Sequence, residues 1–140
     1  MHGRRGRATL RHLTKQGSRA IRDILSITKA LSDESRLRAL IAVKDGELCL
    51  CQIIQVLGLS PATVSKHMDI LERAGLVQRR REGKWRFYRL ADGAKDRPAT
   101  SALALLLAEL RGDPRVKEDA RRIRTVRRQD LGELSACYRS

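Results

Sequence analysis

The chain has 140 residues, the size of one domain, and its 30 lysine and arginine residues outnumber its 16 aspartate and glutamate residues to give a net charge of +14. Such a field attracts polyanions, but four aromatic residues are too few for the stacking platforms of RNA and single-strand binders. The longest apolar run, residues 102–108, is far shorter than a membrane span, so we expect a double-stranded DNA partner and no membrane contact.

Residues 1–19 carry six basic and no acidic side chains, and we interpret them as a basic N-terminal arm. This segment lacks the apolar core of a signal peptide, so we expect a cytoplasmic protein. In a reducing cytoplasm, three cysteines favour metal or redox chemistry over structural disulfides.

The first half of the chain predicts three helices. An apolar stripe at helical spacing begins near residue 19, and Ser32 or Asp33 then caps a second helix with Leu40 on its buried side. The segment ELCLCQIIQVLG begins at Glu47 and predicts a short buried helix that ends at Gly58.

A fourth helix has clear end signals, because Ser60 suits the N-cap, Pro61 suits the first turn and Gly75 ends the pattern. Its predicted inner face consists of Val64, Met68 and Leu71. The segment LVQRRREGKWRFYRL predicts two strands joined by the turn REGK, with Trp85 and Phe87 covering the core. An apolar helix then ends at Gly112, and Asp113-Pro114 begins a last basic helix that continues to about residue 129.

This order predicts a mainly α fold with a β-hairpin, a winged helix-turn-helix. We assign residues 20–130 to this domain and residues 131–140 to a C-terminal tail that carries Cys137.

The strings LSDESRLRAL, GELCLCQI, LGLSPATVSKHMDILERAGLV and RREGKWRFYRL resemble, in order and spacing, the ArsR/SmtB family of winged-helix metal-sensing repressors. The element ELCLC is similar to the ELCVC element of its arsenic-responsive members. The resemblance implies a homodimer built from the first and last helices, repression of a resistance operon, and release from DNA when trivalent arsenic or antimony binds to thiolates.

The same resemblance implies that Cys49 and Cys51 are ligands. In a regular helix, residues i and i+2 point about 200° apart, whereas in an extended segment they share a face, so both sulfurs can hold one ion only where the backbone is not fully helical. The third thiol of the arsenic pattern falls at Ile54, which cannot bind a metal ion. Cys137 is therefore the candidate third ligand.

The outer face of the fourth helix predicts the DNA contacts, since a helix in the major groove presents its outer face to base edges. We expect Ala62 to meet thymine methyl groups and Thr63, Ser65 and Lys66 to donate or accept hydrogen bonds at the base edges. We also expect Ser60 to lie beside the DNA at the helix start and His67 to pack or to reach a phosphate. Arg81 and Lys84 of the hairpin are expected to contact phosphates or the minor groove.

Other readings stay open at this point. Zinc, cadmium and lead are alternative ions, and zinc would add His2 and His12 of the arm as ligands. The family resemblance also implies a second type of zinc site, built from histidines of the last helix. Residues 94–129 contain no histidine, so we do not expect that site here. The thiols are alternatively a redox or persulfide sensor. A nucleoid-type binder without an effector is a further alternative. We do not expect an enzyme, because a thiol oxidoreductase would need C-x-x-C.

Overall fold

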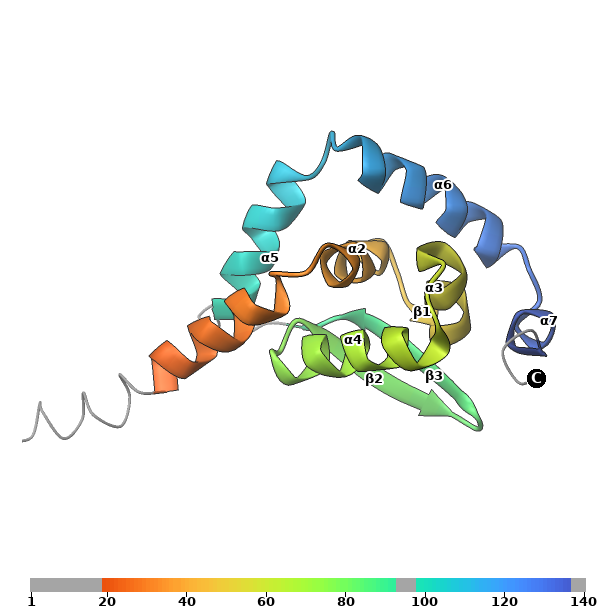
Figure 1. Cartoon of the computed structure of the whole chain (residues 1–140), viewed down its shortest axis with the longest axis horizontal. Helices are drawn as coiled ribbons and strands as arrows, with labels where there is room; N and C mark the ends of the chain where they lie inside the picture. Colours follow the sequence, from red (N-terminus) through yellow and green to blue (C-terminus); the bar gives the residue numbers. More distant parts are fainter. Residues whose placement is uncertain (1–18, 93–97, 137–140) are drawn as a thin grey trace, which may run out of the picture.

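The computed structural model describes residues 19–92 and 98–136, and it has the predicted architecture (Figure 1). A helix covers residues 19–30. It is followed by α2 (Glu34–Ala42), β1 (Leu48–Cys49), α3 (Leu50–Leu57), α4 (Pro61–Arg73), β2 (Val77–Glu82), β3 (Trp85–Leu90), α5 (Pro98–Glu109), α6 (Pro114–Arg127) and α7 (Leu131–Ala136). The prediction of a mainly α winged helix-turn-helix is confirmed: α3 and α4 form the helix pair, and β2 and β3 form the wing.

The helix ends follow the local signals in the sequence. The side chains of Asp33, Ser60 and Asp113 each accept a hydrogen bond from a backbone N–H in the first turn of the next helix, which satisfies a donor that the helix itself cannot pair. Gly58 ends α3 with φ 68°, and Gly83 turns the wing with φ 59°. Both values lie in the left-handed region that glycine adopts without strain.

Three antiparallel strands form the sheet, in the order β1-β3-β2. Within the wing, Val77 pairs with Leu90 and Glu82 pairs with Trp85, so the turn between the strands has two residues. The short strand β1 was not predicted from the sequence. It pairs Cys49 with Phe87 and thus joins the cysteine segment directly to the wing.

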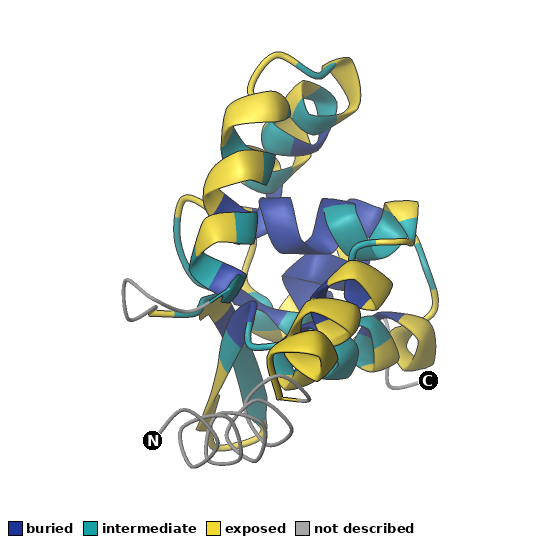
Figure 2. Ribbon diagram, turned by 90° about the vertical axis from the view of Figure 1, so that its left-hand side faces the viewer, coloured by how far each residue is buried: buried dark blue, intermediate teal, exposed yellow. Residues whose placement is uncertain are grey.

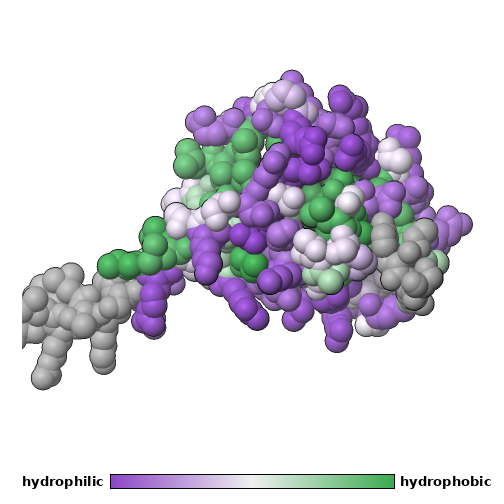
Figure 3. All heavy atoms as spheres, in the orientation of Figure 1, coloured by the Kyte–Doolittle hydropathy of each residue, from purple (hydrophilic) through white to green (hydrophobic). Residues whose placement is uncertain are grey.

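The core lies among α2, α3, α4 and the sheet (Figure 2). Val64, Met68 and Leu71 are buried, which confirms the predicted inner face of α4. The apolar side chains of the first helix lie largely outside this core, since Ile21 and Leu25 are 62% and 60% exposed. Hydrophobic side chains are visible on this helix and on α5 (Figure 3).

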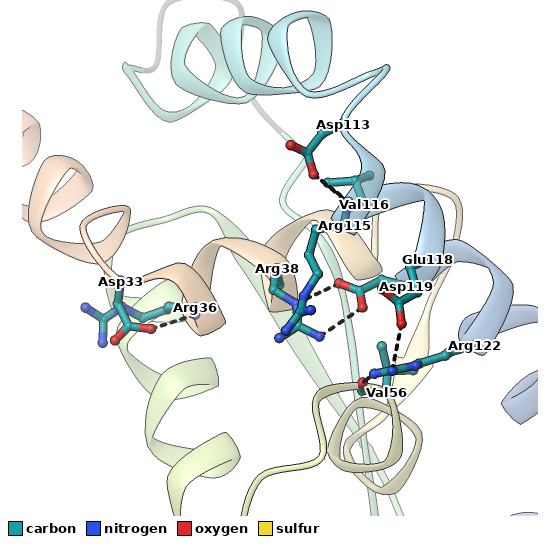
Figure 4. A network of polar contacts seen from close by, with 10 residues as sticks. All are labelled: Asp33, Arg36, Arg38, Val56, Asp113, Arg115, Val116, Glu118, Asp119 and Arg122. Atoms are coloured by element: carbon teal, nitrogen blue, oxygen red, sulfur yellow. Dashed lines mark hydrogen bonds and ion pairs between the residues drawn. The ribbon is translucent and has the colours of Figure 1, made fainter.

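The C-terminal helices α6 and α7 extend over the domain. A buried ion pair holds α6 to α2: Arg38 donates to both carboxylate oxygens of Asp119, at 2.8 and 2.9 Å (Figure 4). Arg127 donates to the carbonyl oxygens of Gly46 and Glu47, just before β1. Residues 131–136, expected to be part of a tail, form the helix α7, while Cys137 lies outside the described residues.

Candidate functional site

The two thiols lie at the junction of β1 and α3. Cys49 is the N-cap of α3, with an extended backbone at φ −72° and ψ 151°, and Cys51 is in the first turn of that helix. The Cys49 N–H donates to Oε1 of Gln52 at 2.7 Å, which closes the start of the helix. Because the backbone is extended at Cys49 and helical only after it, the two side chains meet.

A hydrogen bond between the thiols makes the two cysteines unequal acids. This bond, aided by the backbone N–H groups of Leu50, Cys51 and Arg86, lowers the pKa of Cys49 to about 7 against the opposing effect of burial. The same bond, with burial and the nearby Cys49 charge, raises the pKa of Cys51. A lowered pKa increases the fraction of the thiolate at neutral pH, and the thiolate is the form that binds metals and reacts.

An apolar cover separates the thiols from solvent. Cys49 and Cys51 are 2% and 6% exposed, and they form a cluster with Leu134 of α7. Trp85 and Phe87 pack against this cluster, so these aromatic residues cover the cysteine pair, whereas the sequence predicted that they cover the main core.

Beyond these two sulfurs, the described residues contain no group of three or more histidine, cysteine or acidic side chains that could hold a metal ion. Cys137 and the two histidines of the arm, His2 and His12, lie outside the described residues. The soft donor pair itself suits a thiophilic ion, because sulfur is the preferred donor of soft acceptors.

The outer face of α4, which the sequence predicts to contact DNA bases, is exposed in part. Ala62, Thr63 and Lys66 are exposed, whereas Ser65 is half-buried. Ser60 is the N-cap and its Oγ lies 2.7 Å from Oγ1 of Thr63, so both hydroxyl groups also stabilise the helix start.

The ring of His67 faces α2 instead of the outer surface. Its side chain is 13% exposed, its Nδ1 lies 3.4 Å from Nη1 of Arg36, and its Nε2 lies 3.9 Å from Oδ1 of Asp33. Burial lowers the pKa of His67, with an opposing contribution from Asp33. Of the two roles expected for this histidine, the geometry corresponds to packing.

The wing carries basic side chains of two kinds. Arg81 in β2 and Lys84 in the turn are exposed, and the Lys84 ammonium lies 5.0 Å from the centre of the Trp85 ring. Arg80 instead faces the domain: it donates to both carboxylate oxygens of Glu47, at 2.6 and 3.0 Å, and its guanidinium lies 4.4 Å from the centre of the Phe87 ring.

Arg86 connects the two cysteines to α4, the helix expected to contact DNA bases. Its backbone N–H faces the Cys49 sulfur, and its Nη1 donates to Oγ of Ser65 at 3.3 Å. The sequence reasoning missed this residue, Arg80 and α7. The alternation of the wing sequence shows that its arginines point to two faces, but it does not identify their partners across the fold.

Comparisons with known proteins now bear on this arrangement. Residues 33–79 match the model of the bacterial regulatory protein arsR family. An HTH-type transcriptional regulator of Methanocaldococcus jannaschii is 42% identical over 67 residues, which cover 47% of this chain and 75% of that protein.

Two further relatives are named for different metals. The arsenic resistance transcriptional regulator ArsR1 of Pseudomonas putida is 39% identical over 74 residues, which cover 50% of this chain and 58% of that protein. The cadmium resistance regulatory protein CadC homolog of Staphylococcus aureus is 38% identical over 71 residues, which cover 50% and 59%. The chain thus spans less than two thirds of the length of these two relatives.

Solved structures share the fold. HlyU from Vibrio cholerae superposes with a TM-score of 0.56 at 29% identity, covering 64% of this chain and 94% of that one. The homodimeric winged helix-turn-helix DNA-binding domain of Mb0332 from Mycobacterium bovis gives 0.56 at 28%, covering 69% and 87%.

Fold and comparisons together define a winged helix-turn-helix regulator of transcription. No described helix is long and apolar enough to cross a membrane. The chain belongs to the ArsR family.

Proposed function

We propose that this protein is a homodimeric repressor that binds operator DNA through α4 and the wing, and that it releases the DNA when its cysteines bind trivalent arsenic or antimony. The observation that carries this proposal is the contact between Cys51, in the first turn of α3, and the acidified Cys49, on the strand β1 that pairs with the wing. The name of the Pseudomonas putida relative supports arsenic as the inducer.

On the DNA side, the exposed Ala62, Thr63 and Lys66 contact base edges, and Arg81 and Lys84 contact phosphates. Ser60 and Ser65 stand at the edge of this surface. His67 contributes by packing α4 on α2. The exposed apolar side chains of the first helix and of α5 support a dimer, which would present two copies of α4 to successive major grooves.

On the thiol side, Cys49, Cys51 and Cys137 would hold a trivalent arsenic ion through three sulfur atoms, a soft donor set that suits it. The lowered pKa of Cys49 favours its thiolate, and Cys51 would lose its proton on binding. Leu134 supports the role of Cys137, because this side chain packs against both cysteines and the chain continues from α7 into residue 137.

The contacts of Cys49 with Cys51 and Arg86 suggest how metal binding would release the DNA. When Cys51 loses its proton, the hydrogen bond between the two thiols is lost, and the Cys49 sulfur changes its position against the Arg86 N–H. Arg86 holds Ser65 on α4, so a shift of β1 against β3 displaces α4 and the wing together. Coupling between two sites typically amounts to about 1–3 kcal/mol, a change of roughly 5- to 150-fold in operator affinity.

Two alternative inducers have specific support. The Staphylococcus aureus relative is named for cadmium resistance, which favours a divalent ion such as cadmium, zinc or lead at the same thiols. The acidified Cys49 beside Cys51 also suits a redox or persulfide sensor, in which a thiolate is oxidised and a neighbouring thiol resolves it. Operator release by cadmium, or by peroxide or polysulfide, in the absence of a response to arsenite would favour one of these.

The test combines operator release with a count of sulfur ligands. Arsenite is titrated into the operator complex of the wild type and of Cys49→Ser and Cys51→Ser, and DNA binding is followed by fluorescence anisotropy. We expect release from the wild type and none from either variant; normal release from both variants would refute the proposal. X-ray absorption should count three sulfur atoms around arsenic in the wild type and two in Cys137→Ser.

A further inference from the structure

A row of cations follows the outward face of α6. Lys117, Arg121, Arg124 and the C-cap residue Arg128 lie at positions i, i+4, i+7 and i+11, which fall on one side of an α-helix. All four are exposed. We call these four residues the outward row; at 1.5 Å per residue it is about 16 Å long.

The charged side chains of α6 outside the row, apart from the exposed Arg115 in its first turn, have partners within the chain. Asp119 binds Arg38, and Arg122 donates to Glu118 at 2.9 Å and to the Val56 carbonyl at 3.3 Å (Figure 4). Arg127 donates to the carbonyls before β1. These contacts come from the inner face and the flanks of the helix, and they hold α6 firmly against α2 and α3.

The outward row has no such partners, since no ion pair or hydrogen bond of its four side chains is recorded among the described residues. Both acidic residues of α6, Glu118 and Asp119, are committed to other arginines. Like charges three and four residues apart destabilise a helix. The negative end of the helix dipole offsets part of this cost at Arg124 and Arg128, but no acidic side chain among the described residues pairs with the row. An external anion would offset the remaining cost.

The shape of the row selects the kind of anion. A straight, rigid row of four cations fits a linear polyanion, and phosphates of one DNA strand follow each other at about 3.4 Å along the duplex axis, so roughly five of them span the row. Insertion into a membrane needs an apolar face, and the apolar side of α6, with Val126 buried, packs on the domain.

The row faces away from the proposed operator. In Figure 1, α6 lies on the far side of α2 from α4 and the hairpin, so one straight duplex cannot touch both surfaces. We propose that the outward row of α6 binds the phosphate backbone of a second segment of duplex DNA, independently of sequence, so that an operator-bound dimer bridges two duplexes. The bridging depends on the proposed operator binding, whereas the binding of the second duplex does not.

The experiment uses the full chain tethered through its N-terminus and two duplexes with different labels, an operator and an unrelated sequence. The row variant Arg121→Gln with Arg124→Gln should keep operator binding and should lower the salt slope for the unrelated duplex by about two units, one for each lost phosphate contact. The wing variant Arg81→Gln with Lys84→Gln should weaken operator binding and should leave the salt slope for the unrelated duplex unchanged.

A control variant, Arg111→Gln with Arg115→Gln, removes the same charge from exposed residues near the row but not in it. This control should leave the salt slope for the unrelated duplex unchanged. Equal losses in the row and control variants would overturn the proposal by showing an effect of net charge alone. A wild type that holds the operator but no second duplex, or whose row binds polyglutamate in place of DNA, would overturn it too. Absence of operator binding alone would count against the proposed function and not against the row.

Discussion

The buried ion pair between Arg38 and Asp119 gives the largest effect on stability that we predict. Both side chains are nearly removed from solvent, at 9% and 5% exposure, and two hydrogen bonds join them. Asp119→Ala leaves a buried guanidinium without its partner, which typically costs about 3–5 kcal/mol. At about 3 °C per kcal/mol for a domain of this size, the melting temperature should fall by roughly 10 °C.

The assay is thermal and urea unfolding followed by circular dichroism at one fixed protein concentration, because the stability of a dimer depends on concentration. Glu118→Ala is the matched control: it breaks the neighbouring ion pair with Arg122, whose partners are about half exposed, and should cost less than about 0.5 kcal/mol. Replacing both partners, as Arg38→Met with Asp119→Leu, should restore most of the loss. A loss below about 1 kcal/mol in Asp119→Ala would refute this reasoning.

Three further predictions concern the thiol, a helix end and the wing. The ultraviolet thiolate absorbance that the wild type has and Cys49→Ser lacks should appear with a midpoint near pH 7, because the pKa of Cys49 is lowered to about 7; a midpoint near 9 would exclude an acidified thiol. Gly58→Ala should cost about 1 kcal/mol of unfolding free energy because φ is 68°, while Gly112→Ala, with equal space around it, should cost much less; equal losses would contradict a backbone cause. Arg86→Gln should weaken operator binding by about 2- to 10-fold through loss of the hydrogen bond to Ser65, and unchanged anisotropy titrations would rule this contact out.

Local signals accounted for the elements that the sequence predicted well. The start of α4 follows from Ser60 and Pro61, its buried face from the spacing of Val64 and Met68, and the wing turn from the two residues that begin with Gly83. Each of these features depends on interactions within a few residues, which a single sequence contains in full.

The features that the sequence did not predict depend on contacts between distant segments. Arg38 and Asp119 are 81 residues apart, and nothing near either residue identifies the other. Residues 131–136 were assigned to a tail and instead form α7. Six residues are too few to form a stable helix alone, and the contact of Leu134 with the two cysteines, far away in the sequence, cannot be read from its neighbours. The orientation of His67 was similarly ambiguous, since its position on α4 lies between the inner and outer faces.

The pairing of β1 with the wing was also not predicted, because it too depends on contact between segments distant in the sequence. Two residues of strand carry little sequence signal, yet this short ladder decides that Cys49 lies against β3 and not at a free helix end. A helix start alone would have offered the thiols no route to the wing. The link between the thiol pair and the DNA-binding surface therefore comes from the fold.

The most direct measurement is the operator affinity of the dimer after saturation with arsenite, compared with the affinity of the arsenite-free dimer at the same salt concentration. Displacement of the Cys49 sulfur from its place beside Arg86 should weaken operator binding by about tenfold or more, which corresponds to roughly 1.4 kcal/mol of coupling. An arsenite-saturated dimer that binds its operator as tightly as the free protein would contradict the proposed link between the thiols and DNA.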